Sequence, residues 1–99
     1  MGEVWRDGLT DQLCKAIIAL KTEKEAYHFL EDVATINEIR SLSQRLEAAR
    51  LLEKGYTYPQ IVQQTGISTA MISRVKKYLE YGADGYKLVL GRMETETRR

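Results

Sequence analysis

The chain has 99 residues, which is the size of one domain or of one protomer in a small oligomer. Its 43% hydrophobic and 29% charged residues are typical of a globular protein and exclude a disordered chain. The longest apolar run, residues 16–20, is far shorter than the roughly 18 residues of a membrane span. A single cysteine and the lack of a basic-then-apolar secretion signal favour the reducing cytoplasm, with no membrane contact.

Charge is distributed unevenly along a chain whose net charge is only +1. Residues 1–67 hold eight Lys or Arg against ten Asp or Glu, whereas residues 68–92 hold five against two. A cationic segment is therefore carried on a mildly acidic body. This distribution is typical of a protein that binds anions with one of its surfaces.

Helical spacing of apolar residues dominates the N-terminal half, and strand-like alternation is nearly absent. The first apolar stripe consists of Leu9, Leu13, Ile17 and Leu20 and predicts a helix near the N-terminus. Thr10 is the expected N-cap of this helix. Capping boxes, in which Glu or Gln follows a Ser or Thr by three residues, predict further helix starts at Thr22, Thr35, Ser41 and Thr57. We expect the Thr35 helix to be short and the Ser41 helix to end at Gly55.

Residues 57–81 predict a helix-turn-helix. Pro59 suits the first turn of a helix over 58–65, because its missing N–H costs nothing there. Gly66 supplies a left-handed backbone conformation for the reversal, and Ser68 is the expected cap of a second helix that ends near Tyr81. The apolar residues that would meet in a small shared core are Ile61, Ile67, Ile72 and Val75.

The end of the chain predicts one more element. Gly82 is expected to end the second helix, and Asp84 to begin a short last helix through Leu90. Residues 1–92 are expected to form a single domain, followed by a polar, flexible tail over 93–99.

The second helix of the pair places small, hydroxylated and cationic side chains opposite its apolar face. These residues are Thr69, Ala70, Ser73, Arg74 and Lys77, with Met71 at the margin. Short side chains allow the backbone to approach a groove, hydroxyls bond phosphates or base edges, and cations reach phosphates or guanines. The helix N-terminus adds a partial positive charge. The alternative is a helical hairpin with an ordinary solvated face.

Catalytic and metal-binding arrangements are not expected. His28 is the one histidine and Cys14 the one cysteine, and they lie on separate predicted helices without the partners that such sites need. We therefore expect no enzymatic activity, no cofactor and no metal.

Three stretches of the chain resemble the Trp repressor superfamily, and most closely its YerC/YecD-type branch of small Trp-repressor-like proteins. They are INEIRSLSQRLEAARLL, TGISTAMISRVKKYL and YGADGYKLVL, and the likeness extends from about Leu9 to Leu90. The resemblance implies an all-α fold of about six helices, an intertwined homodimer, and a recognition helix that each protomer presents to the major groove.

The resemblance also implies an effector pocket. The Trp repressor clamps its corepressor between two arginines, which resemble Arg45 and Arg74 here. Met71 and Val75 stand where the repressor has a small threonine and a glycine. Val75 would fill the space of an indole ring, and added volume in a tight pocket costs about 1–3 kcal/mol. We expect no response to tryptophan, and the identity of any other effector stays open.

The sequence therefore favours a homodimeric, sequence-specific DNA-binding transcriptional regulator. Phosphate contacts are expected from Tyr58, Gln60, Lys76, Lys77 and Tyr78. Base discrimination is expected from Ser68, Thr69, Ala70, Met71, Ser73 and Arg74. The alternative is a helical dimer that keeps the turn as a scaffold and binds a protein instead of double-stranded DNA.

Overall fold

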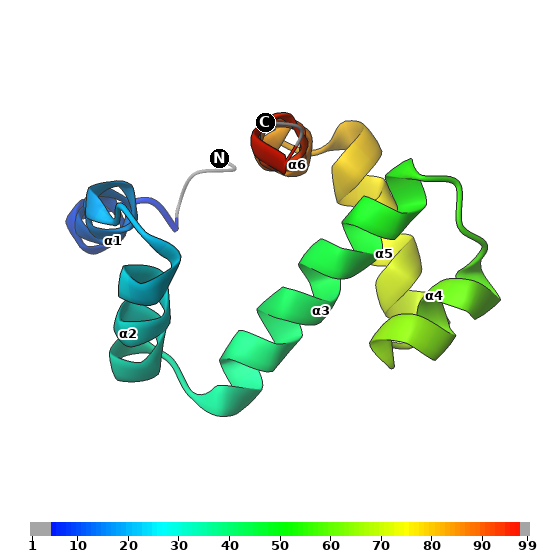
Figure 1. Ribbon diagram of the computed structural model, residues 1–99, viewed down its shortest axis with the longest axis horizontal. Helices are drawn as coiled ribbons and strands as arrows, with labels where there is room; N and C mark the ends of the chain where they lie inside the picture. Colours follow the sequence, from blue (N-terminus) through cyan, green and yellow to red (C-terminus); the bar gives the residue numbers. More distant parts are fainter. Residues whose placement is uncertain (1–4, 98–99) are drawn as a thin grey trace. The chain divides into compact units, whose positions relative to one another are not determined.

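The computed structural model describes residues 5–97, and all regular secondary structure in this range is α-helical (Figure 1). The all-α prediction is therefore confirmed. The helices are α1 (Gly8–Ala19), α2 (Glu23–Val33), α3 (Ile36–Glu53), α4 (Tyr58–Thr65), α5 (Thr69–Tyr81) and α6 (Gly85–Thr97). None of these helices is both long and apolar enough to cross a bilayer, a finding that covers the described residues.

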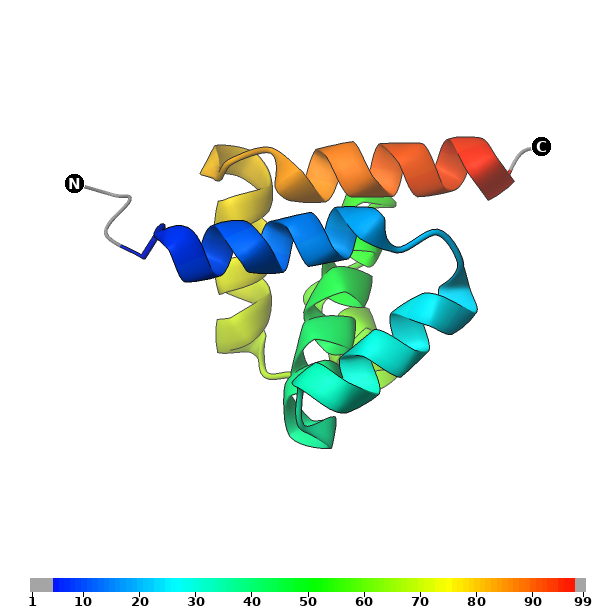
Figure 2. The ribbon, with the colours of Figure 1, turned by 90° about the vertical axis from the view of Figure 1, so that its left-hand side faces the viewer.

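The chain divides into two compact units. The boundary between them along the chain lies in the first turn of α3, between Ile36 and Asn37. The first unit holds α1 and α2, and neither helix has a buried residue. The second unit holds the rest of α3 and α4 to α6, with α6 leading away sideways from the end of α5 (Figure 2). Its core consists of Ala48, Ala49, Leu51, Ile61, Ile72, Val75 and Leu90. That residues 1–92 form one domain stays a prediction.

The start of α1 differs from the prediction. Asp7, rather than Thr10, is the N-cap: its Oδ1 accepts the backbone N–H of Thr10 at 2.9 Å, and Thr10 Oγ1 accepts the backbone N–H of Asp7 at 2.8 Å. The bond from the Thr10 amide is the main reason why the pKa of Asp7 is lowered. The prediction of Thr10 as the cap was wrong because Leu9, the first residue of the apolar stripe, already lies in the first turn of the helix.

Thr22 caps α2 as predicted, because its hydroxyl accepts the Glu25 amide at 3.1 Å. The Glu25 carboxylate reaches back to the backbone N–H of Lys21 at 2.9 Å, one residue before the partner that a capping box would give it.

The two helices expected to start at Thr35 and Ser41 form one continuous helix. α3 begins directly after Thr35 and runs for 18 residues, so the predicted start at Ser41 is wrong. Inside a helix the backbone amides already bond to carbonyls four residues earlier, and a serine there has no orphan donor to cap. The Ser41 oxygens instead accept bonds from the Arg45 guanidinium, at 3.4 Å to the carbonyl and 3.2 Å to the hydroxyl.

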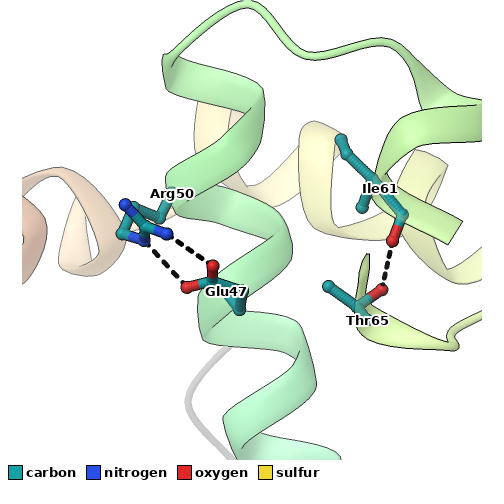
Figure 3. Close-up of polar contacts among 4 residues, drawn as sticks. All are labelled: Glu47, Arg50, Ile61 and Thr65. Carbon is teal, nitrogen blue, oxygen red and sulfur yellow. Dashed lines mark hydrogen bonds and ion pairs between the residues drawn. The ribbon is translucent and has the colours of Figure 1, made fainter. Parts of the chain in front are cut away.

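One turn further along α3, Glu47 and Arg50 form a two-point ion pair (Figure 3). The bond from Arg50 is the main cause of the lowered pKa of Glu47. Both side chains remain partly exposed to solvent, Arg50 40% and Glu47 38%, so the pair contributes little to the free energy of unfolding.

Gly55 ends α3 close to the predicted place. Its backbone is left-handed, with φ of +87°, its N–H bonds to the Leu52 carbonyl at 3.1 Å, and the Tyr56 N–H bonds to the Leu51 carbonyl at 3.1 Å. These two bonds are the Schellman motif, which satisfies carbonyls that the end of a helix leaves open.

The last helix is longer than predicted. α6 begins at Gly85, after Asp84 in a left-handed conformation with φ of 66°, and it continues to Thr97 instead of ending near Leu90. No proline interrupts residues 91–97, and Thr95 Oγ1 bonds back to the Gly91 carbonyl at 3.0 Å. Most of the expected flexible tail is therefore helical here, while residues 98–99 lie outside the described range.

The left-handed backbone at Gly55 predicts a specific loss of stability on substitution. Gly55→Ala adds a methyl group that meets no atom within 4 Å, so the cost is purely conformational, about 1–2 kcal/mol of the free energy of unfolding. Gly91→Ala is the matched control, since this helical glycine is equally open and lacks a positive φ; it should stabilise by about 0.5–1 kcal/mol. Urea unfolding of the two variants measures both values, and equal shifts would contradict this role of Gly55.

Candidate nucleic-acid interface

The first helix of the predicted pair starts with a complete capping box. The Thr57 hydroxyl accepts the Gln60 amide at 3.4 Å, and Gln60 Oε1 accepts the Thr57 amide at 2.9 Å. Pro59 lies in the first turn, as predicted. The box sets the start of α4, and it occupies the Oε1 atom of the Gln60 side chain.

The turn after α4 is held by hydrogen bonds around a left-handed glycine. Gly66 has φ of +78°, and its N–H bonds to the Val62 carbonyl at 2.8 Å. The buried Thr65 donates its hydroxyl to the Ile61 carbonyl at 2.7 Å, as Figure 3 shows, and the same hydroxyl accepts the Ile67 amide at 3.3 Å. The predicted role of Gly66 is confirmed.

One partner of the turn comes from outside the helix-turn-helix and was not predicted from the sequence. Gln44, on α3, donates its Nε2 to the Thr65 carbonyl at 2.9 Å. The Ser-x-x-Gln spacing suggested that this glutamine belonged to a capping box with Ser41. Nothing in the local pattern indicates a contact across 21 residues.

The core beneath the turn forms as predicted. Ile61 on α4 and Ile72 and Val75 on α5 are fully buried, and Ile67 packs against them from the turn itself. Burial of three branched side chains from both helices fixes the angle between them, since close-packed interiors tolerate little change of shape.

The opposite face of α5 is open to solvent. Ser68 caps the helix by accepting the Met71 amide at 3.1 Å. The exposed residues are Ser68, Thr69, Ala70, Ser73, Arg74, Lys76, Lys77 and Tyr78, while Met71 is half-buried at the margin. This small, hydroxylated and cationic set is called the α5 face below.

Two side-chain contacts shape the α5 face. Ser73 Oγ donates to the hydroxyl of the half-buried Tyr58 at 3.4 Å, which joins α5 to the start of α4. The Arg74 guanidinium lies over the Tyr78 ring, 6.0 Å from its centroid. Within residues 5–97 no carboxylate forms an ion pair with Arg74, Lys76 or Lys77. Their charges are therefore available to an anion.

Two of the four residues of the expected effector pocket share the core, while its two arginines have other partners. Val75 is buried in the core, Met71 packs against that core, Arg45 is bonded to Ser41, and Arg74 lies over Tyr78. None of them lines the open apolar groove of about 440 Å³ in the same unit. That groove is formed by Leu46, Tyr78, Ala83, Gly85, Tyr86 and Val89.

Comparison with known proteins agrees with this geometry. The family model described as Trp repressor protein matches residues 9–94. The chain is 56% identical, over 88 residues, to the uncharacterized protein YerC of Bacillus subtilis strain 168, and the match covers 88% of this chain and 85% of YerC.

Two solved structures have the same fold. A TrpR-like protein from Eubacterium eligens shares 52% of its residues, with a TM-score of 0.86 over 90% of this chain and 92% of that one. A structure from Staphylococcus aureus shares 48%, with a TM-score of 0.88 over 93% and 92%. The chain belongs to the Trp repressor family.

Proposed function

We propose that the protein is a sequence-specific DNA-binding transcriptional regulator that acts as a homodimer through its helix-turn-helix. The observation that carries this proposal is the α5 face: short side chains, hydroxyls and unpaired cations on one exposed side of a helix that a buried core and a bonded turn hold in place. The family supports the same role. A cytoplasmic location, which the single cysteine favours, is part of the proposal.

The α5 face divides by chemistry into two sets of contacts. Ser68, Thr69, Ala70, Met71, Ser73 and Arg74 would discriminate bases, because they lie along the first turns of the helix, where a groove floor comes close. Tyr58, Gln60, Lys76, Lys77 and Tyr78 would bind phosphates. Of these, Gln60 would use its amide nitrogen, since its oxygen is bonded to Thr57.

The first unit supports dimerisation. Its described residues, 5–36, include none that is buried, and the α1 stripe is largely open, with Leu9 82% and Ile17 52% exposed. Large contiguous apolar surfaces of this kind are usually covered in the functional state. A second copy of the chain would supply the cover and present a second α5 face.

A selection of bound oligonucleotides from a random pool tests the whole proposal. The recovered sites should be near-palindromic, with half-sites about one helical turn, or 34 Å, apart. Binding measured by fluorescence anisotropy should weaken steeply with added salt, since phosphate contacts release counterions. No binding at low salt would overturn the proposal and favour the protein-interaction module.

Arg74→Ala should weaken binding to the selected site more than binding to a random duplex, because a lost arginine–guanine contact costs about 1–3 kcal/mol of discrimination. Lys77→Ala is the matched control from the same helix. It should weaken both duplexes alike and lower the salt slope by about 1. Equal losses for Arg74→Ala on the two duplexes would show that Arg74 does not read bases.

L-Tryptophan should not bind to the protein. Val75 stands where the repressor has a glycine, and its side chain is buried in the core cluster. Isothermal titration calorimetry of the dimer with L-tryptophan should give only heats of dilution. Saturable micromolar binding would prove this expectation wrong.

A further inference from the structure

We propose that Gln44 is a positioning residue that sets the orientation of the α5 face for sequence-specific binding, an inference that rests on the proposed function. Gln44 lies on α3, outside the helix-turn-helix. Its Nε2 donates to the Thr65 carbonyl, the last carbonyl of α4, at 2.9 Å. This bond joins the long helix of the unit to the turn between the two helices.

The Thr65 carbonyl needs an external donor. The end of a helix leaves its last carbonyls without intrahelical partners. In α4 the Val62 carbonyl, the first of these, is satisfied by the Gly66 amide at 2.8 Å. Because the chain reverses at Gly66, no amide of the same helix follows to bond Thr65, and Gln44 supplies the donor.

Gln44 also lies directly over the turn. A Cβ built on Gly66 would be 3.7 Å from Gln44 Nε2, which is van der Waals contact. The Thr65 hydroxyl in turn accepts the Ile67 amide at 3.3 Å, and Ser68, the cap of α5, follows at once. Gln44 and the Ile67 amide thus both bond to Thr65, and the residue after Ile67 is the cap of α5.

This arrangement predicts an effect on specificity rather than on general affinity. The Gln44 side chain is half-buried and makes its bond inward, so phosphate attraction by the exposed cations does not depend on it. Base reading depends on the position of short side chains such as Thr69 and Ser73, which tolerate little displacement. Loss of the bond should therefore lower the ratio of specific to non-specific binding.

Gln44→Met tests the proposal, because methionine keeps the length of the side chain and removes the donor. The control is Gln64→Met: Gln64 is exposed on α4, and its side chain bonds to no described residue. Affinity for the selected site should fall about tenfold in Gln44→Met, with less than about twofold change on random duplex. Gln64→Met should leave the ratio of the two affinities unchanged.

A second pair keeps the proposal falsifiable if methionine perturbs folding. Gln44→Glu places a carboxylate against the Thr65 carbonyl and should lower the ratio further, whereas Gln64→Glu adds the same charge and should weaken both duplexes alike. Circular dichroism checks that each variant keeps its helices. Equal ratios in the Gln44 and Gln64 variants would overturn the proposal.

Amide hydrogen exchange separates this inference from the proposed function. Without DNA, the Ile67 amide should exchange faster in Gln44→Met than in the unmodified protein, while the Gly82 amide, bonded to the Tyr78 carbonyl at 2.9 Å at the far end of α5, should not change. If the unmodified protein binds no duplex, the regulator proposal fails, and the exchange at Ile67 still decides whether Gln44 holds the turn. Unchanged exchange at Ile67 would refute that role.

Discussion

The reversal of the backbone between α4 and α5 is the constraint on which the candidate interface depends. It requires a left-handed residue at Gly66, whose amide bonds the Val62 carbonyl, and it leaves the Thr65 carbonyl to a side chain from outside the helix. Gln44 bonds that carbonyl, and Ile61, Ile72 and Val75 close the core underneath. Every property of the α5 face follows from this small assembly, because it decides which side of the helix meets solvent.

Electrostatics in this molecule is a matter of placement rather than of total charge. A net charge of +1 is too small to attract a polyanion by itself. The cations of α5 are accessible because no described carboxylate neutralises them, and they follow the hydroxyls at the start of the same helix. The acidic residues belong mainly to the rest of the chain. This separation of charges favours the binding of an anion to the α5 face over its binding to the more acidic surfaces of the protein.

Much of the fold could be predicted from the sequence, and the successes share a cause. Thr22, Thr57, Gly66 and Ser68 were assigned correctly because caps and left-handed turns are set by bonds within three or four residues. The errors arose where a local pattern has two meanings. A serine such as Ser41 can cap a helix or lie inside one, and the packing of the whole unit determines which of the two occurs.

The candidate site shows the same division. The exposure of Thr69, Ser73 and Arg74 followed from the apolar stripe on the other side of α5. The bond from Gln44 could not be predicted, since it depends on how α3 lies against the turn. The long α6 was missed because the apolar stripe ends at Leu90, whereas the turns beyond it are held by bonds within the helix, such as the one from Thr95 Oγ1 to the Gly91 carbonyl.

The extent of α6 has a consequence for local unfolding. Leu90 is the last buried residue among the described side chains of α6, and residues 91–95 are exposed. Opening the turn after Leu90 therefore uncovers no residue of the core cluster. Stability along this helix declines toward its end, so a peptide fused behind it would be attached where the core of the second unit is least affected.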